Sequence, residues 1–379
     1  VVLSTTYSIK GTLGIDHIYD YLIVDEASQV DLATGVLAFS CARNIVIVGD
    51  LKQLPNVLTE NDIRTSDAIW QKYSLDERYR FSTHSLLSSA LEIWRDAPVT
   101  LLREHYRCHP KIINFCNQRF YGGRLLIMTE DHGEPDVITA WRTAPGHHAR
   151  GPFNPREIET IRREVLPSLP CEQAEIGIIS PYNEQVNALH RELGGGIDVA
   201  TVHKFQGREK EAIILSTVDD QITAFTDDPN LLNVAVSRAK RQFTLVTSSN
   251  EQSDSRNIAD LLAYIDYNGG KITESAIHSV FDLLYEPYAE ARREFLKRHR
   301  RISEFDSENL TYALLERVLE TDPAFRHLGV LCHQPLRQLI RDWMLLNDEE
   351  RRYASNGATH LDFLIYNRVS KRPVLAVET

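Results

Sequence analysis

The sequence predicts an α/β protein built on parallel sheets. Short apolar runs that end in polar turns recur along the chain, and helical patterns separate them. Parallel strands that are buried on both faces have this character, and crossover helices connect them. A chain of 379 residues is too long for one ordinary core, so we expect two or three domains.

Composition narrows the class of protein. Hydrophobic residues make up 42% and charged residues 25%, a balance typical of globular proteins. The formal net charge of −11 excludes a general basic field, so a nucleic acid would have to bind in a local groove. Five cysteines without metal or redox spacing favour a reducing compartment, and we expect a cytoplasmic monomer. No apolar run is long enough for a membrane span, so we expect no membrane partner.

The first unit contains three predicted strands, at residues 1–3, 21–24 and 44–48, followed by mostly helical residues 56–100. The second of these strands ends abruptly in two adjacent carboxylates, Asp25 and Glu26. Ligands of open α/β sheets bind just beyond the carboxyl ends of the strands. Next to a metal-bound nucleotide, Asp25 can hold the metal while Glu26 orients and deprotonates the attacking water. The alternative is a solvated acidic turn.

The third strand leads into a polar loop, Gly-Asp-Leu-Lys-Gln-Leu-Pro at residues 49–55. The amide of Gln53 can bond both to a terminal phosphate and to the attacking water, so this loop can sense hydrolysis. Alone it could be an ordinary turn, but its place after Asp25 and Glu26 favours a sensor.

A second α/β unit follows. A helix is predicted from about Lys111, and Asn154 and Pro155 are typical of a helix start. Strands are predicted at residues 175–181, 199–202, 212–217 and 243–247.

Arg107 and Arg238 lie at the mouth of this second unit. Planar guanidinium groups suit the charge that develops on a transferring phosphoryl group, although a lone arginine is more often a surface ion pair. Residues 201–209 gather hydroxyl, imidazole, amide and backbone donors beside a glycine, which suits phosphate contact.

Five motifs in this order resemble those of the superfamily 1 helicases, in the branch that includes the nonsense-mediated-decay RNA helicase and its DNA-replication relatives. Asp-Glu-Ala-Ser-Gln (25–29) resembles motif II, Gly-Asp-Leu-Lys-Gln-Leu-Pro (49–55) motif III, Tyr-Arg-Cys-His-Pro (106–110) motif IV, His-Lys-Phe-Gln-Gly-Arg-Glu (203–209) motif V, and Val-Ala-Val-Ser-Arg-Ala-Lys (234–240) motif VI. The resemblance covers about residues 1–250. It implies two RecA-like domains, the first incomplete, with ATP and Mg²⁺ between them and single-stranded nucleic acid across their top. The sequence does not distinguish DNA from RNA, and of the two we expect DNA.

The resemblance also implies roles for individual residues. Asp25 resembles the Mg²⁺ ligand and Glu26 the catalytic base, while Gln53 resembles the γ-phosphate sensor. Arg107 and Arg238 resemble the arginine fingers. Further nucleotide contacts are implied for Gln29, Asp50, Tyr106, Gly207 and Glu209, the last to the ribose. Contacts to the nucleic-acid strand are implied for Thr5, Pro55, Ser180, Tyr182, Asn183, Thr201 and His203.

The sequence departs from the family in one respect. It contains no G-x-x-x-x-G-K-[ST] segment, the loop that cradles the phosphates. In the family this loop lies before the point that corresponds to Val1, so we expect a truncated chain that alone hydrolyses no ATP. The alternative is a nucleic-acid or protein-binding scaffold that has lost ATP turnover.

Helical patterns dominate from Ile258 to about Met344, and one of them, residues 291–301, is strongly basic. We interpret it as a solvated helix face, with a phosphate-tracking surface as the alternative. Two short strands, 361–366 and 374–377, then form a predicted hairpin that brings Asp362 beside Glu378.

Paired carboxylates in that position can hold Mg²⁺ against a scissile phosphate. The pattern resembles the restriction-endonuclease-like (PD-(D/E)xK) fold, with Glu308 of a preceding helix as a third acid. The alternative is an accessory domain with exposed acids. We therefore expect four segments: the end of the first RecA-like domain at 1–100, the second at 101–250, a helical linker at 251–304 and a partial nuclease-like domain at 305–379.

Overall fold

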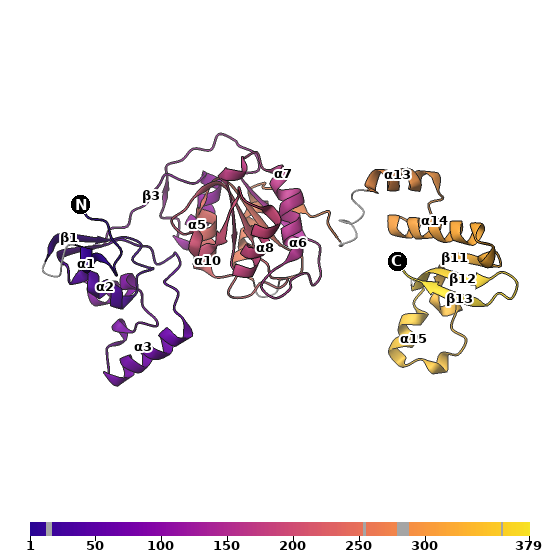
Figure 1. Ribbon diagram of the computed structural model, residues 1–379, viewed down its shortest axis with the longest axis horizontal. Coiled ribbons are helices and arrows are strands. Elements are labelled where there is room, and N and C mark those ends of the chain that lie inside the picture. Colours follow the sequence, from indigo (N-terminus) through magenta and orange to yellow (C-terminus); the bar gives the residue numbers. More distant parts are fainter. Residues whose placement is uncertain (13–16, 253–254, 279–287, 358) are drawn as a thin grey trace. The chain divides into compact units, whose positions relative to one another are not determined.

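The computed structural model describes residues 1–12, 17–252, 255–278, 288–357 and 359–379 (Figure 1). The chain divides into two compact units, Val1–His278 and Ser279–Thr379. The α/β class and the parallel sheets predicted from the sequence are confirmed. In these ranges no helix combines the length and the apolar character that a membrane crossing requires.

The first sheet consists of two parallel strands, β1 (Tyr19–Val24) and β2 (Ala42–Ile47), connected through helix α2 (Leu32–Phe39). Val24 pairs with Ile47, so both strands end at the same edge. The remaining helices of this region are α1 (Ile9–Thr12), α3 (Glu60–Lys72) and α4 (Leu86–Ile93), with a 3₁₀ turn at Glu77–Tyr79.

Two predictions for this region were wrong. Residues 1–3 form no strand, and β1 is not buried on both faces. Val24 packs with Ala27, Leu86 and Leu87, while Tyr21 is exposed. The reason is that helices cover one face of a two-stranded sheet, so alternate side chains of β1 face away from that core.

The second sheet has six parallel strands in the order β10-β5-β9-β8-β6-β7. They are β5 (Ile138–Thr143), β6 (Ile176–Ser180), β7 (Asp198–Thr201), β8 (Lys210–Ser216), β9 (Ala239–Ser248) and β10 (Ile272–Glu274). A separate parallel pair, β3 (Glu104–His105) and β4 (Leu126–Ile127), lies outside this sheet.

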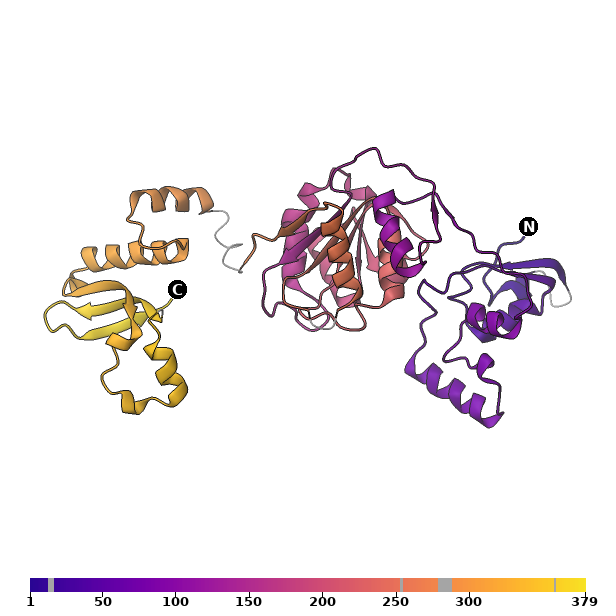
Figure 2. The same cartoon turned by 180° about the vertical axis from the view of Figure 1, so that it is seen from behind.

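Helices cover both faces of the six-stranded sheet (Figure 2). One core lies under α5 (Pro110–Phe120), α10 (Pro229–Ser237) and α11 (Asn257–Tyr267). The other lies under α6 (Pro155–Thr160), which continues through a π-helical turn (Ile161–Val165) into α7 (Leu166–Ser168), and under α8 (Asn183–Leu193). Asn154 caps α6 by accepting from two backbone N–H groups, as its sequence predicts. The short helix α9 (Val202–Phe205) leaves β7 directly.

The second sheet extends past the boundary predicted at residue 250. Strand β10 pairs with β5, and Ile258, Leu261 and Ile265 of α11 belong to the first of the two cores. The segment predicted as a linker from 251 therefore begins as part of this domain. The basic stretch predicted at 291–301 forms α13 (Ala289–Arg298), where the exposed pair Arg298–Glu294 fits a solvated helix face.

The second unit carries an antiparallel sheet in the order β11-β12-β13. Its elements are α14 (Asp306–Thr321), β11 (Leu328–Pro335), α15 (Asp348–Ser355), β12 (His360–Asn367) and β13 (Pro373–Val377), with 3₁₀ turns at 323–325, 336–338 and 343–345. Leu319 of α14 packs on Leu328 and Ile365. The hairpin of β12 and β13 is confirmed, whereas β11 lies in a stretch predicted to be helical.

Candidate functional site

The two acids after β1 sit in a turn that backbone hydrogen bonds hold against β2. The N–H of Ala27 donates to the carbonyl of Val48 (2.9 Å), and the N–H of Val48 donates to that of Val24 (2.8 Å). Glu26 adopts a positive φ of 51°, a conformation that costs a non-glycine residue about 1–3 kcal/mol. Its N–H donates to Oδ1 of Asp25 (2.8 Å). The turn therefore holds both carboxylates at the carboxyl edge of the first sheet.

Gln206 connects the predicted base to the predicted sensor. Its Nε2 lies 3.3 Å from Oε2 of Glu26 and 3.3 Å from Oε1 of Gln53. Nε2 of Gln29 also donates to Oε2 of Glu26 (3.3 Å). Three residues predicted from motifs II and III thus meet, and Gln206 joins them from the second sheet domain. Oε1 of Gln206 is buried and has no hydrogen-bond partner among the described residues.

Asp50 anchors a second contact between the two sheet domains. Its Oδ2 accepts from the hydroxyl of Tyr121 (2.6 Å), and Asn233 donates to that same hydroxyl (2.8 Å) and to the carbonyl of Lys52 (2.7 Å). Burial, followed by the nearby Asp50 carboxylate, raises the pKa of Tyr121, so this phenol stays protonated and donates. The motif III loop is therefore tied to α5 and α10.

Arg107 forms an ion pair with Glu209 (2.5 Å), and Lys240 pairs with the other oxygen of Glu209 (2.7 Å). The hydrogen bond from Lys240, together with the charge of Arg107, lowers the pKa of Glu209 and keeps it ionised. Arg238 is 4% exposed and donates to the carbonyl of Val234 (3.3 Å). Burial lowers the pKa of Arg238, with the charge of Arg107 as the next cause.

Backbone contacts explain why the two arginines share one region. The N–H of His109 donates to the carbonyl of Lys240 (2.7 Å), which places motif IV beside motif VI. His105 lies in the same region: burial and then the charges of Arg107 and Arg238 lower its pKa to about 4, so it is neutral near pH 7. Glu209 precedes β8 and Arg238 precedes β9, so this cluster lies at the amino edge of the second sheet.

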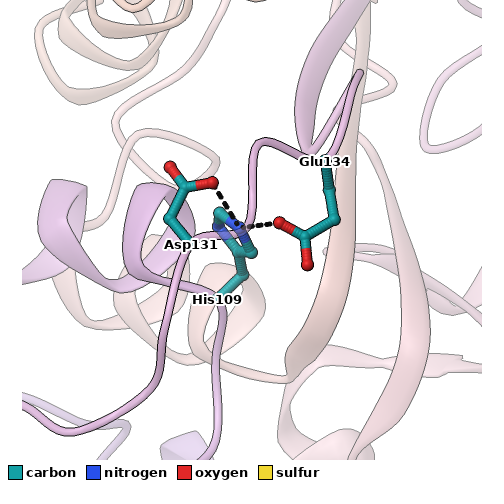
Figure 3. Close-up of side chains that lie close together, drawn as sticks. All are labelled: His109, Asp131 and Glu134. Carbon is teal, nitrogen blue, oxygen red and sulfur yellow. Dashed lines mark hydrogen bonds and ion pairs between the residues drawn. The ribbon is translucent and has the colours of Figure 1, made fainter.

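A buried histidine, two residues after Arg107 in the sequence, contacts two carboxylates (Figure 3). Nε2 of His109 lies 3.2 Å from Oε2 of Glu134 and 3.5 Å from Oδ1 of Asp131, and no other group of three described His, Cys, Asp or Glu side chains is as compact. Nδ1 of His109 accepts from the N–H of Lys111 (3.1 Å) and caps α5. The proton of the neutral ring is then on Nε2, where it points to the acids, so no lone pair is free for a metal ion. Lys111 also pairs with Asp131 (3.3 Å). We interpret these residues as a clamp between residues 131–134 and α5.

The residues predicted to touch nucleic acid lie mainly at the carboxyl edge of the second sheet. Ser180 and Thr201 end the neighbouring strands β6 and β7 and pair in register. Tyr182 occupies the N-cap position of the helix that follows β6, without a side-chain capping bond, and Asn183 begins that helix. Pro55 and His203 line one pocket of about 530 Å³ together with Gln29, Asp31, Ala33, Asn56, Val57, Leu58, Asp62 and Phe81. Thr5 lies on the first sheet domain, where its Oγ1 accepts from the N–H of Ser8 (3.3 Å).

In the second unit the structure brings two of the three predicted acids together. The register Phe363–Val377 makes Asp362 and Glu378 neighbours, and burial followed by the Asp362 charge raises the pKa of Glu378. Oδ2 of Asp362 accepts from the N–H of Thr379 (2.7 Å). Glu308 instead pairs with His333 of β11 (2.8 Å).

Known proteins are similar in sequence to parts of the first unit. Two family profiles, both described as AAA domain, match residues 1–61 and 138–250. An ATP-dependent helicase, MJ0104 of Methanocaldococcus jannaschii, is 30% identical over 260 residues, covering 61% of this chain and 36% of the relative. The chicken DNA replication helicase/nuclease DNA2 is 28% identical over 265 residues, covering 65% and 25%.

Among solved structures, the PRRSV helicase is 15% identical with a TM-score of 0.34, covering 71% of this chain and 50% of that one.

A third curated relative, the uncharacterized ATP-dependent helicase C05C10.2 of Caenorhabditis elegans, is 29% identical over 271 residues, 65% of this chain and 17% of the relative. The chain thus spans between 17% and 36% of the length of these three curated relatives. The five motifs on two parallel-sheet domains, the two family profiles and the curated relatives together support a superfamily 1 helicase of the DNA2 and nonsense-mediated-decay type.

Proposed function

We propose that this chain works in an ATP-dependent helicase or translocase that hydrolyses ATP between its two parallel-sheet domains. One observation carries the proposal: Gln206 of the second domain bonds to both Glu26 and Gln53 of the first. This contact joins a carboxylate that can activate water to an amide that can detect the terminal phosphate.

The side chains in the first domain suit the roles that we propose. The carboxylate of Asp25 is exposed and one of its oxygens accepts from the N–H of Glu26, so its other oxygen can ligate Mg²⁺. Bound there, Mg²⁺ would neutralise phosphate charge. Glu26 orients and deprotonates the water, and Gln53 contacts the γ-phosphate.

The basic cluster of the second domain supplies the remaining roles. Arg107 and Arg238 stabilise charge that grows in the transition state, and Glu209 binds the ribose. The pair Arg107–Glu209 has to separate for both roles to operate, so nucleotide binding exchanges partners at this cluster. Gln29, Asp50, Tyr106 and Gly207 complete the proposed nucleotide contacts.

We propose single-stranded DNA as the second partner. The carboxyl edge that carries Ser180, Tyr182, Asn183 and Thr201 is the proposed strand site. DNA is favoured because relatives such as the mouse 5′-3′ DNA helicase ZGRF1, 28% identical over 254 residues, are named as DNA helicases.

The test is the strand-stimulated ATPase activity of the full-length protein. Glu26→Gln preserves the shape of the side chain but removes the base, so we expect turnover to fall at least about 100-fold while ATP and strand still bind. Glu192→Gln, an exposed acid on α8, is the matched control and should retain activity. Turnover within about threefold of wild type in Glu26→Gln would overturn the assignment of Glu26 as the general base. Absence of turnover in the wild type would favour the scaffold that binds without hydrolysis.

A metal-dependent nuclease in the second unit is a second proposal. The observation that favours it is the neighbouring pair Asp362 and Glu378 on adjacent strands, in which burial and then the charge of Asp362 oppose ionisation of Glu378. A divalent cation would relieve this repulsion and could bind a scissile phosphate. Glu308 can join the pair only if it exchanges its contact with His333.

Cleavage assays on the full-length protein test the nuclease. We expect Mg²⁺- or Mn²⁺-dependent cleavage of single-stranded, duplex or flapped DNA, abolished by Asp362→Ala. Asp348→Ala removes an exposed acid of α15 and is the matched control. Equal cleavage by wild type and Asp362→Ala, or no cleavage by either on all three substrates, would show that the second unit is an accessory domain and not a nuclease.

A further inference from the structure

The loop after β8 lies against the start of α8 at the carboxyl edge of the second sheet. Strands β6 and β8 are neighbours, with Ile179 paired to Leu215, so the segments that follow them are adjacent. The first segment contains Tyr182, and the second, residues 217–228, contains Phe225. The two rings lie 5.4 Å apart between centroids at an angle of 53°. Phe225 is 49% exposed although it packs against another aromatic ring.

Asp219 fixes this aromatic pair. Its carboxylate accepts from the hydroxyl of Tyr182 (3.0 Å), from the N–H and hydroxyl of Thr223 (3.2 and 2.8 Å) and from the hydroxyl of Thr226 (2.7 Å). Four donors on one carboxylate leave the loop little freedom on either side of Phe225. The ring is therefore held at the surface by contacts of its neighbours.

Buried polar side chains hold the base of the loop in a strained conformation. Val218 has a φ of 74°, which is unfavourable for a β-branched residue. Both oxygens of Glu157 accept from its N–H (3.0 Å each), and Asn154 donates to its carbonyl (2.8 Å). Glu157 and Asn154 are each 0% exposed. Strain that a buried network maintains at a surface loop is typical of functional sites.

The composition of the loop at 217–228 favours contact with the bases of a nucleic acid over contact with its phosphates. Residues 217–228 include four aspartates and no lysine or arginine, which disfavours contact with phosphates. An exposed aromatic face has no such restriction, because every base can stack on it. Ser180 ends β6 at the same edge, and its buried Oγ has no hydrogen-bond partner among the described residues.

We propose that Phe225, supported by Tyr182, is a stacking platform for one base of the bound single strand. This inference rests on the proposed strand binding at the same edge and adds a residue and a kind of contact to it. The platform binds the face of the base without hydrogen bonds to its edge, so all four bases can stack on it.

The test measures binding of two labelled oligonucleotides to the full-length protein by fluorescence anisotropy. One is a single strand of mixed sequence, and the other has the same backbone with abasic sites throughout. Phe225→Ala should weaken binding of the first by about tenfold, leave binding of the second unchanged and keep the salt dependence. Phe225→Trp should restore affinity. Tyr267→Ala, which removes a 90% exposed ring at the end of α11, is the matched control.

The outcomes separate the two proposals. Equal loss on both oligonucleotides would show that Phe225 only supports the local structure, and no loss on either would show that it contacts no base; both results overturn the platform while strand binding stands. A wild-type protein that binds neither oligonucleotide would overturn strand binding itself.

Discussion

At the residue scale, the protonation of the buried Glu157 carboxyl makes the free energy of unfolding depend on pH. Burial raises its pKa from an ordinary 4.5 to about 8, against the hydrogen bonds from Ser216, Val218 and Thr217 that favour the charged form. The folded protein therefore holds a proton that the unfolded chain releases between these two pH values. The stability contribution is fully present below about pH 4.5 and falls as the pH rises through 8, by up to about 5 kcal/mol.

Thermal unfolding of the full-length protein between pH 5 and 9 measures this contribution. We expect the unfolding midpoint to fall with rising pH in the wild type, and to vary less in Glu157→Gln, which cannot lose the proton. Glu159→Gln, a half-buried acid on the same helix whose pKa is lowered by Arg162 and Arg163, is the control. Identical pH profiles for wild type and Glu157→Gln would show that Glu157 is ionised throughout.

The two arginines of the nucleotide cluster should act mainly on turnover. Since both guanidinium groups are placed to meet charge that grows in the transition state, Arg107→Ala and Arg238→Ala should each lower kcat by about 1,000-fold or more and change KM little. Steady-state kinetics with saturating strand measure both constants, and Arg241→Ala, whose side chain is 71% exposed, is the control. An unchanged kcat with a raised KM would show that these residues bind ground-state ATP.

The sequence predicted these arginines, Glu26 and Gln53 because each lies inside a contiguous motif. It did not predict that Gln206 contacts the motif II and III loops or that Tyr121 contacts the motif III loop. Those contacts span 180 and 71 residues of chain, and only folding brings their partners together. Gln206 does lie inside the motif at 203–209, so its amide was a signal that the sequence contains.

At the scale of elements, strands that are continuous apolar runs were predictable, and others were not. Strand β5 reads Ile-Thr-Ala-Trp-Arg-Thr and mixes polar with apolar positions, while β10 has three residues. Strand β11 contains Cys, His and Gln in an antiparallel sheet with one face less covered. Such segments become strands because they pair with distant parts of the chain. The local pattern of residues therefore does not predict them.

The clamp at the start of α5 gives a prediction for one element. His109→Ala removes a cap and the contacts to Asp131 and Glu134, so hydrogen exchange at residues 128–134 and in the first turn of α5 should accelerate. His109→Asn restores a capping acceptor and should protect the turn alone. In the wild type, Zn²⁺ or Mn²⁺ should leave exchange in this region unchanged; protection on adding either ion would show that the three side chains bind metal.

At the scale of the whole first unit, the proposed strand and nucleotide sites lie at opposite edges of the second sheet. Thr201 ends β7 at the carboxyl edge, and Glu209 precedes β8 at the amino edge. Helix α9 and the turn after it connect these two residues, and Gln206 lies in that turn. A bound nucleic-acid strand that displaces Thr201 can therefore move Gln206 relative to Glu26. This short segment of chain would couple the nucleic-acid site to the nucleotide site.

This path predicts how Gln206→Ala behaves in the full-length protein. Removing the amide breaks the contacts with Glu26 and Gln53 but leaves Thr201 and the strand edge intact. We expect strand affinity to stay near wild type, while stimulation of ATPase activity by the strand is largely lost. Lys204→Ala changes an exposed residue of the same helix and should retain stimulation. Full stimulation in Gln206→Ala would mean that the two sites communicate through other contacts, of which Asp50–Tyr121–Asn233 is the next to test.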